Sequence, residues 1–302
     1  MLLKKRTESD ELLIMRYLNK RMQFNEKEKF HYLNSEKGYE GDVKFDQYTE
    51  NLNEERFILN DLLLEVNNSY FQIDTLIISQ GIIQLIDIKN YEGDCYLESD
   101  KLYSVKTGRE YKNPINQLNR RETLLSQLLE NLKYTYLVES SVVYINPEFT
   151  LYQAPMDQPI IFRSQVNRFI NELNKSPSQL NSRDKDVARK LISLHHPKNP
   201  FHVHPSYNYE QLQKGVYCNN CNSHFMSIKN HDFVCESCGE HEKIQMSILR
   251  HVKEFRLLFP ERKITTNAIY EWCNANLNKK TVCKVLKKNF TAEGKTKETY
   301  YK

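Results

Sequence analysis

Apolar residues follow two different patterns along the chain, and each pattern predicts a different kind of element. Residues 61–66 and 71–89 are rich in Ile, Leu and Val on both faces, as in strands that are covered on both sides. Pro114 begins a segment whose leucines recur at helical spacing, at Leu118, Leu125, Leu128, Leu129 and Leu132. Together these segments predict an α/β fold, a mixed sheet flanked by helices.

Periodicity, caps and turn residues also predict the other elements of the chain and its division into parts. Residues 9–60 have a helical pattern behind a Ser/Asp cap, with a second, acidic helix at about 39–53. Strands are expected at 140–146 and 159–162, and helices at 163–174 and 178–196. The stretch HHPKNPFHVHPSYNYEQ has three prolines and no period, which is typical of a linker. The expected parts are an N-terminal helical segment (1–34), an α/β domain (35–194), a linker (195–214), a cysteine-bearing module (215–242) and a basic domain (243–302).

The apolar run FQIDTLIISQGIIQLIDIKNYEG, residues 71–93, contains one turn signal, Gln80-Gly81. A two-residue turn there pairs Ser79 with Ile82, and the same register sets Asp74 opposite Asp87. Lys89 projects from the same face as Asp87, because side chains along a strand alternate with period 2. The hairpin therefore brings two carboxylates and an ammonium group together.

Two opposed carboxylates in a covered sheet need a compensating cation or raised pKa values. A hard divalent ion with oxygen ligands, Mg²⁺ or Mn²⁺, fits this spacing, with Asp74 and Asp87 as its ligands. The alternative is that the strand ends reach solvent and the two acids are ordinary surface residues.

Several short motifs resemble one known family. QID at Gln72–Asp74, the glycine turn at Gly81, DIKN at Asp87–Asn90, and NPINQ at residues 113–117 are similar to the core of the nuclease-related domain (NERD). GYEGD at Gly38–Asp42 resembles the family's GxxGE element, which lies on its first core helix. The resemblance covers about residues 35–150. The family is a branch of the PD-(D/E)XK nuclease-like superfamily, so the resemblance implies a restriction-endonuclease-like sheet.

The resemblance also implies Mg²⁺-dependent hydrolysis of DNA phosphodiesters, with catalytic roles for Asp74, Asp87, Lys89, Gln117 and Asp42. Asp74 and Asp87 would bind the metal, and Lys89 would orient the attacking water or stabilise developing negative charge. Gln117 would position water or contact the DNA backbone, and Asp42 would complete the metal shell through water. Two positions depart from the family pattern, since Asp87 stands for the Glu of ExK and Asp42 for the Glu of GxxGE. For Gln117 the alternative is a cap or a solvent contact, and for Asp42 an ordinary acid in a first helical turn.

Four of the seven cysteines form two CxxC pairs, Cys218 with Cys221 and Cys235 with Cys238. This spacing is typical of a tetrahedral Cys₄ site for Zn²⁺, and the intervening residues fit the hairpin of a zinc ribbon. Four thiolates leave no open coordination position, so the expected role of the zinc is structural.

Charge is unevenly distributed along the 302 residues, whose net charge is +4. Residues 245–302 carry 13 Lys and Arg against 5 Glu, a net +8, so the rest of the chain carries −4. The tail predicts three helices and a hairpin, the outline of a winged helix, a small α+β domain. Its last helix exposes Lys280, Lys284, Lys287 and Lys288, the expected phosphate contacts in DNA. The alternative is a packing domain with a solvated lysine face.

The sequence thus predicts a cytoplasmic, Mg²⁺- or Mn²⁺-dependent deoxyribonuclease with a structural zinc ribbon and a basic DNA-binding module. The alternative is a catalytically inactive DNA-binding or scaffolding protein that keeps the nuclease fold. DNA is the expected partner, and the sequence leaves open a homo-oligomer. No apolar run approaches the ~20 residues of a membrane span, so no membrane partner is expected.

Overall fold

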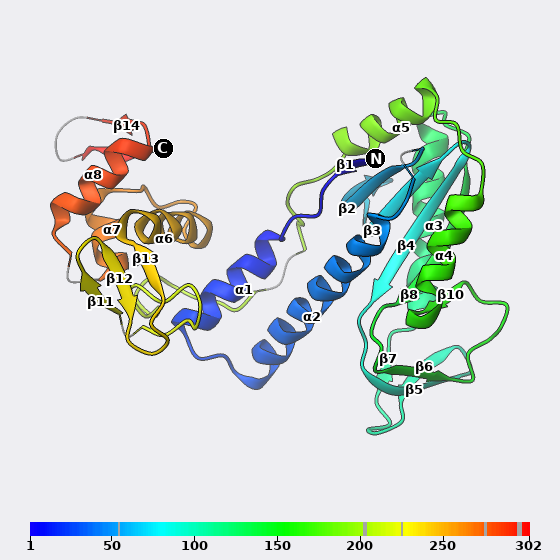
Figure 1. Ribbon diagram of the computed structural model, residues 1–302, viewed down its shortest axis with the longest axis horizontal. Coiled ribbons are helices and arrows are strands. Elements are labelled where there is room, and N and C mark those ends of the chain that lie inside the picture. Colours follow the sequence, from blue (N-terminus) through cyan, green and yellow to red (C-terminus); the bar gives the residue numbers. More distant parts are fainter. Residues whose placement is uncertain (54, 202–203, 225, 275–276, 295–297) are drawn as a thin grey trace. The chain divides into compact units, whose positions relative to one another are not determined.

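The protein folds into two compact units. A computed structural model describes residues 1–302 except 54, 202–203, 225, 275–276 and 295–297 (Figure 1). One unit comprises Met1–Glu8 and Leu33–Phe201, and the other Ser9–Tyr32 and His202–Lys302. The expected N-terminal segment, residues 1–34, is therefore divided between the two units.

The first unit is built on a six-stranded mixed sheet. Its strands, in spatial order, are β1 (Leu2–Lys4), β2 (Phe57–Val66), β3 (Ser69–Ser79), β4 (Ile82–Lys89), β8 (Leu137–Tyr144) and β10 (Ile160–Phe162). The three central strands β2, β3 and β4 are antiparallel, whereas β1, β8 and β10 each run parallel to their neighbour. The mixed sheet predicted from the apolar runs is confirmed.

Helices cover both faces of this sheet (Figure 1). On one face, α3 (Pro114–Asn131) and α5 (Ser182–Ser193) pack on the strands through apolar side chains such as Leu118, Leu125 and Leu191. On the other face, α2 (Glu26–Thr49) and α4 (Val166–Lys175) do so through Phe45 and Ile170. The two-sided burial explains why β3 and β4 carry apolar residues on both faces and are buried at most positions.

A smaller, four-stranded sheet extends the first unit. It has the order β7 (Glu110–Tyr111), β6 (Lys101–Ser104), β5 (Gly93–Glu98) and β9 (Phe149–Tyr152). Residues 57–60, which the sequence pattern assigned to a helix, are the start of β2, and the acidic helix expected at 39–53 is the second half of the longer α2. The segment FILN is apolar enough to be buried in the sheet, and this burial outweighs its local helical pattern.

The second unit combines α1 (Asp10–Arg21) with the C-terminal third of the chain. Ser9 caps α1, as predicted, since its hydroxyl accepts the Leu12 N–H at 3.2 Å. The cysteine-bearing module forms a three-stranded antiparallel sheet of β11 (Met226–Lys229), β12 (Asp232–Cys235) and β13 (His241–Lys243).

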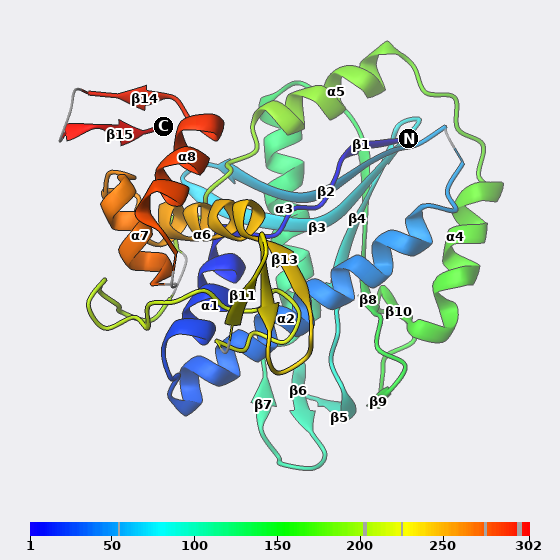
Figure 2. The same cartoon turned by 60° about the vertical axis from the view of Figure 1, so that its left-hand side comes forward.

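The basic domain follows this sheet directly. It consists of α6 (Ile244–Leu258), α7 (Thr266–Cys273), α8 (Lys279–Asn289), β14 (Ala292–Glu293) and β15 (Tyr300–Tyr301). Figure 2 shows the three helices with the β14–β15 strands after α8, and Ile264 forms a further bridge to Tyr301. Three helices and a small antiparallel sheet are the winged-helix outline predicted from the sequence. None of the described helices has the length and apolar character needed to cross a bilayer.

Candidate active site and cysteine cluster

The β3–β4 hairpin has the register predicted from its sequence. Gly81 has a φ of +73°, in the left-handed region that a tight turn requires. Ser79 pairs with Ile82 and Thr75 with Ile86, so the next position along this register sets Asp74 opposite Asp87. Counted outward from the turn, the pairing of the two strands ends at Thr75, so it stops one residue short of Asp74.

The alternation of faces along β3 reverses at Asp74. Ile73 and Leu76 lie in the same hydrophobic cluster, although an odd separation should place them on opposite faces. Asp61, at the facing position on β2, has a φ of +56°. At this kink the Asp74 Oδ2 atom accepts the backbone N–H of Ile88 at 2.8 Å. The hydrogen bond brings the Asp74 carboxylate against the main chain at Asp87, since the Ile88 nitrogen is bonded to the Asp87 carbonyl carbon.

Asp87 is a fully buried carboxylate between two cations. Its side chain is 0% exposed, its Oδ2 atom lies 2.7 Å from Lys89 Nζ, and its Oδ1 atom forms an ion pair with Arg121 Nη1. Neither oxygen has a hydrogen-bond partner with good geometry among the described residues, and the same is true of Arg121 Nη1. A buried carboxylate that is compensated by charge but not by hydrogen bonds is uncommon and marks a candidate functional site.

Helix α3 brings Arg121 to this carboxylate. Asn113 caps the helix by accepting the Ile115 N–H at 2.9 Å, and Pro114 occupies its first position. Gln117 is half-buried and lies one turn before Arg121 on the same helix face, which places it on the side of α3 that reaches Asp87. Sequence reasoning selected Gln117 but missed Arg121, although the four-residue spacing between them could have pointed to it.

The GYEGD segment lies on α2, where Gly41 allows a close approach to the end of β4. A Cβ atom at Gly41 would lie 2.5 Å from the Asn90 Cβ atom, and Asn90 Nδ2 donates to the Lys37 carbonyl at 2.7 Å. This contact docks α2 beside the DIKN segment. Asp42 is the next residue, whereas Glu40 is exposed to solvent.

Asp42 lies close to Asp74 and to a cation that sequence reasoning missed. Arg6 Nη1 is 3.1 Å from Asp42 Oδ2, and Arg6 Nη2 donates to the Asp74 carbonyl at 2.9 Å. Burial and the neighbouring charge of Asp74 raise the pKa of Asp42 well above its usual range, although Arg6 opposes this shift. No local pattern could have revealed Arg6, because it is 36 residues from Asp42 in the sequence.

The structure thus brings most of the predicted residues to one end of the sheet. Asp74, Asp87 and Lys89 lie where the pairing of β3 and β4 ends, and Arg6 links Asp42 on α2 to the Asp74 main chain. Gln117 lies one turn before Arg121 on α3. The three acids do not form a compact ligand set, however. Among the described residues, the four predicted cysteines are the one group of three or more Cys, His, Asp or Glu side chains with all ligand atoms within 4.8 Å of one another.

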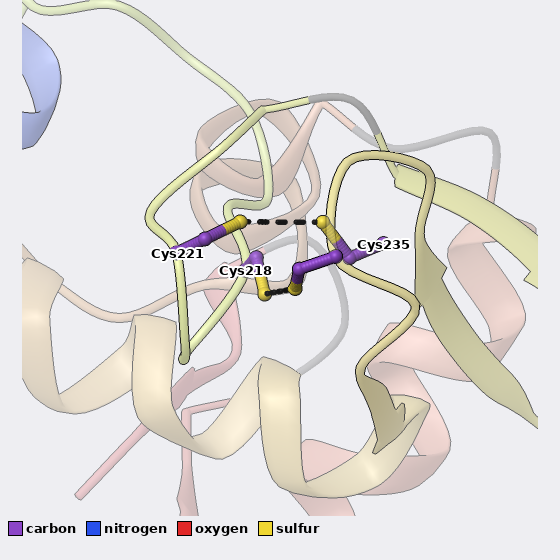
Figure 3. A group of neighbouring side chains, drawn as sticks. Cys218, Cys221 and Cys235 are labelled. Atoms are coloured by element: carbon purple, nitrogen blue, oxygen red, sulfur yellow. Dashed lines mark hydrogen bonds between the residues drawn. The ribbon is translucent and has the colours of Figure 1, made fainter.

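The cysteine cluster has the geometry of a four-sulfur metal site. Cys218 Sγ lies 3.7 Å from Cys238 Sγ, and Cys221 Sγ lies 3.5 Å from Cys235 Sγ (Figure 3). Four sulfurs about 2.3 Å from a tetrahedral zinc ion would be about 3.8 Å apart, so these separations fit zinc. Burial raises the pKa of the Cys235 thiol, but the N–H groups of Cys238 and Ser237 and the neighbouring thiols have a larger, opposite effect. Together they lower the pKa of Cys235 to about 6.

The two CxxC segments form matching turns. The N–H of Asn222 bonds to the Cys218 carbonyl at 3.1 Å, and the N–H of Gly239 bonds to the Cys235 carbonyl at 2.9 Å. Both Asn222 and Gly239 have positive φ, at +61° and +76°. Two equivalent turns that present two sulfurs each are the arrangement expected of a zinc ribbon.

The predicted lysines lie together on α8. Lys280, Lys284, Lys287 and Lys288 are all exposed, whereas Val282, Val285 and Leu286 are buried in the core of the second unit. The amphipathic pattern predicted for this helix is confirmed. Asn278 caps the helix by accepting the Lys280 N–H at 2.9 Å.

Comparison with known proteins identifies one region of the chain. Residues 37–145 match the family model of the nuclease-related domain, NERD. No curated protein and no solved structure matches the chain. The matched residues contain the kinked hairpin, Asp42 on α2 and Gln117 and Arg121 on α3. The chain therefore carries a nuclease-related domain over residues 37–145, as its motifs predicted, followed by a four-cysteine cluster that could bind zinc.

Proposed function

We propose that the protein is a Mg²⁺-dependent nuclease that hydrolyses phosphodiester bonds in DNA. The observation that carries the proposal is the buried Asp87 carboxylate, 2.7 Å from Lys89 and next to Asp74 at the separation of β3 and β4. Its position in a nuclease-related domain supports a reaction on nucleic acid. The match to that family model supports a nuclease-related function, and the metal, the reaction and the DNA substrate are the proposal.

The donor set fits a hard divalent cation. The two Asp87 oxygens are buried and have no well-oriented hydrogen bond among the described residues, so a metal ion that binds them would replace ion pairs with Lys89 and Arg121. The Asp74 Oδ2 atom accepts the Ile88 N–H, and its other carboxylate oxygen would bind the cation. Carboxylate oxygens are the ligands that Mg²⁺ and Mn²⁺ prefer. When bound, such an ion lowers the pKa of a coordinated water and neutralises phosphate charge.

The surrounding side chains have complementary roles in this proposal. The Lys89 ammonium, beside Asp87, orients the attacking water or stabilises the negative charge that develops on the phosphate. Gln117 positions water or the DNA backbone from α3. Asp42 supplies a third carboxylate on the α2 side, next to Asp74.

The second unit would supply affinity for DNA. We assign phosphate contacts to the exposed α8 lysines, Lys280, Lys284, Lys287 and Lys288, because the paired helices α7 and α8 resemble a helix-turn-helix, whose second helix enters the major groove. We also assign Zn²⁺ to the four cysteines in a structural role, since four thiolates leave no position for a substrate.

Nicking of supercoiled plasmid tests the proposed reaction. Wild-type protein in Mg²⁺ or Mn²⁺ is expected to convert supercoiled into relaxed DNA, and EDTA should abolish the conversion. Asp87→Ala and Lys89→Ala should each reduce the rate by at least about 10²-fold, because each removes a group from the reacting centre. Binding of the same plasmid should persist in both variants.

One observation favours a second candidate, a nuclease-fold protein that binds DNA without cleaving it. The Arg121 ion pair with Asp87 gives this carboxylate a cation without any metal. Plasmid binding with no metal-dependent nicking would reject the nuclease and support this alternative.

A further inference from the structure

Arg6 is a buried cation that joins the N-terminal arm, Met1–Glu8, to the candidate active site. The arm begins as strand β1, which pairs with β2 at the edge of the six-stranded sheet. Arg6 follows two residues later, and its side chain is only 4% exposed. Its position in the sequence, outside residues 37–145, separates it from the nuclease-related domain.

The Arg6 guanidinium bonds to two elements at once. On α2, Nε and Nη2 bind the two carboxylate oxygens of Asp46 at 2.9 Å each, and Nη1 binds Asp42 Oδ2 at 3.1 Å. On β3, Nη2 donates to the Asp74 carbonyl at 2.9 Å and to Thr75 Oγ1 at 3.1 Å. Asp42 and Asp46 lie one turn apart on the same face of α2. Arg6 thus ties this helix face to β3 at the kink.

These bonds hold Asp42 next to Asp74 against their mutual repulsion. Burial most disfavours a charged Asp42, the charges of Asp74, Asp46 and Asp61 add to this effect, and Arg6 opposes it. Arg6 is also the one donor to the Asp42 carboxylate in the described parts of the chain, and it binds Oδ2. The second oxygen, Oδ1, is left for another ligand.

We propose that Arg6 is a positioning residue, which holds the Asp42 carboxylate beside Asp74 so that both acids serve one divalent cation. The inference rests on the proposed function, because it concerns the same metal site. The planar guanidinium is suited to this role, since its fixed fork contacts several acceptors in one plane. Lysine would keep the charge but could not reproduce these contacts.

Binding of Mn²⁺ to the zinc-loaded, full-length protein tests the role of Arg6 without DNA. The free Mn²⁺ signal in electron paramagnetic resonance gives the dissociation constant, and Asp74→Asn identifies binding at this site. Arg6→Gln is expected to weaken Mn²⁺ binding about 10- to 100-fold, the usual effect of losing a partner that orients a metal ligand. Arg6→Lys should show a loss of similar size, because the fork and not the charge positions Asp42.

Arg250→Gln is the matched control. Arg250 also binds a carboxylate through two nitrogens, with distances of 3.0 and 2.7 Å to Glu242, but it lies in the second unit. Its substitution removes an equal charge and should leave Mn²⁺ affinity unchanged. Far-UV circular dichroism checks folding, and Arg6→Lys decides the test if Arg6→Gln does not fold.

The outcomes separate this inference from the proposed hydrolysis. Wild-type Mn²⁺ affinity in the folded Arg6 variants would overturn the role of Arg6 alone. Mn²⁺ binding that depends on Arg6, in a protein that does not nick DNA, would support the role of Arg6 and overturn hydrolysis. A wild-type protein that binds no Mn²⁺ at the Asp74-dependent site would overturn both.

Discussion

At the level of single residues, the buried carboxylates of the two units differ in how completely they are hydrogen-bonded. In the second unit, Arg21 and Glu254 are fully buried and form two hydrogen bonds of 2.7 Å, and Trp272 Nε1 also donates to Glu254 at 3.3 Å. Asp87 in the first unit is equally buried, but its contacts with cations lack hydrogen-bond geometry. A fully bonded pair is typical of a structural role, whereas an incompletely bonded one favours a site that receives a ligand.

His251, in the core of the second unit, predicts a pH dependence of stability. Burial is the main cause that lowers the pKa of His251 well below its usual range, and Arg250 and Arg21 lower it further. Below about pH 6.5 the unfolded chain therefore binds a proton that the folded unit does not. The free energy of unfolding should fall with decreasing pH, by up to about 1.4 kcal/mol per pH unit. Trp272, the one tryptophan of the chain, lies in this core, so its fluorescence can follow urea unfolding at pH 7.5 and 5.5.

Comparison of variants isolates this histidine from the cysteines, whose protonation also destabilises the second unit at low pH. His251→Gln should reduce the loss of stability between the two pH values by about 1 kcal/mol. His241→Gln is the control, because the His241 side chain is 59% exposed, and it should retain the wild-type loss. Equal pH dependence in His251→Gln and the wild type would show that this histidine is not the cause.

At the level of elements, the two glycines of GYEGD make opposite predictions for α2. Gly41→Ala places a methyl group 2.5 Å from the Asn90 Cβ atom and should push α2 away from β4, at a cost of roughly 1–3 kcal/mol. Gly38→Ala meets no atom within 4 Å and should stabilise the helix by about 0.5–1 kcal/mol. Hydrogen exchange followed by mass spectrometry should therefore show faster exchange in α2 and β4 for Gly41→Ala only. Slower exchange in both variants would contradict the proposed docking contact.

The features that could be predicted from the sequence are those that local turns and periodic spacing determine. The β3–β4 register follows from one turn at Gly81, and the apolar faces of α3 and α8 follow from helical spacing. The small strands β1 and β5–β7 have 2–6 residues each, too few for a period to emerge. Arg6 was missed because its partners are distant in sequence and only the tertiary fold brings them together, whereas Arg121 follows Gln117 at helical spacing and could have been inferred.

At the level of the whole molecule, the proposed chemistry and the proposed DNA affinity belong to different units. The chain passes from the first unit to the second at residue 9, returns at residue 33 and leaves again after residue 201. Asp74, Asp87 and Lys89 lie in the first unit, and the α8 lysines lie in the second. Substitutions in the two units should therefore affect different steps, cleavage in one and binding in the other.

Salt dependence of DNA binding distinguishes phosphate contacts on α8 from a merely solvated lysine face. Each phosphate contact contributes about −0.9 to the slope of log K against log salt concentration, so Lys284→Gln with Lys288→Gln should reduce the slope by about 2. A labelled duplex measured by fluorescence anisotropy between 50 and 200 mM salt gives this slope. Lys243→Gln with Lys253→Gln removes the same charge from exposed positions elsewhere in the second unit and should change the slope much less. If both double variants change the slope equally, only net charge matters and α8 has no specific role. If α8 contacts the phosphates, the Lys284→Gln, Lys288→Gln variant should also need more DNA for half-maximal nicking. Its maximal nicking rate should stay at the wild-type value.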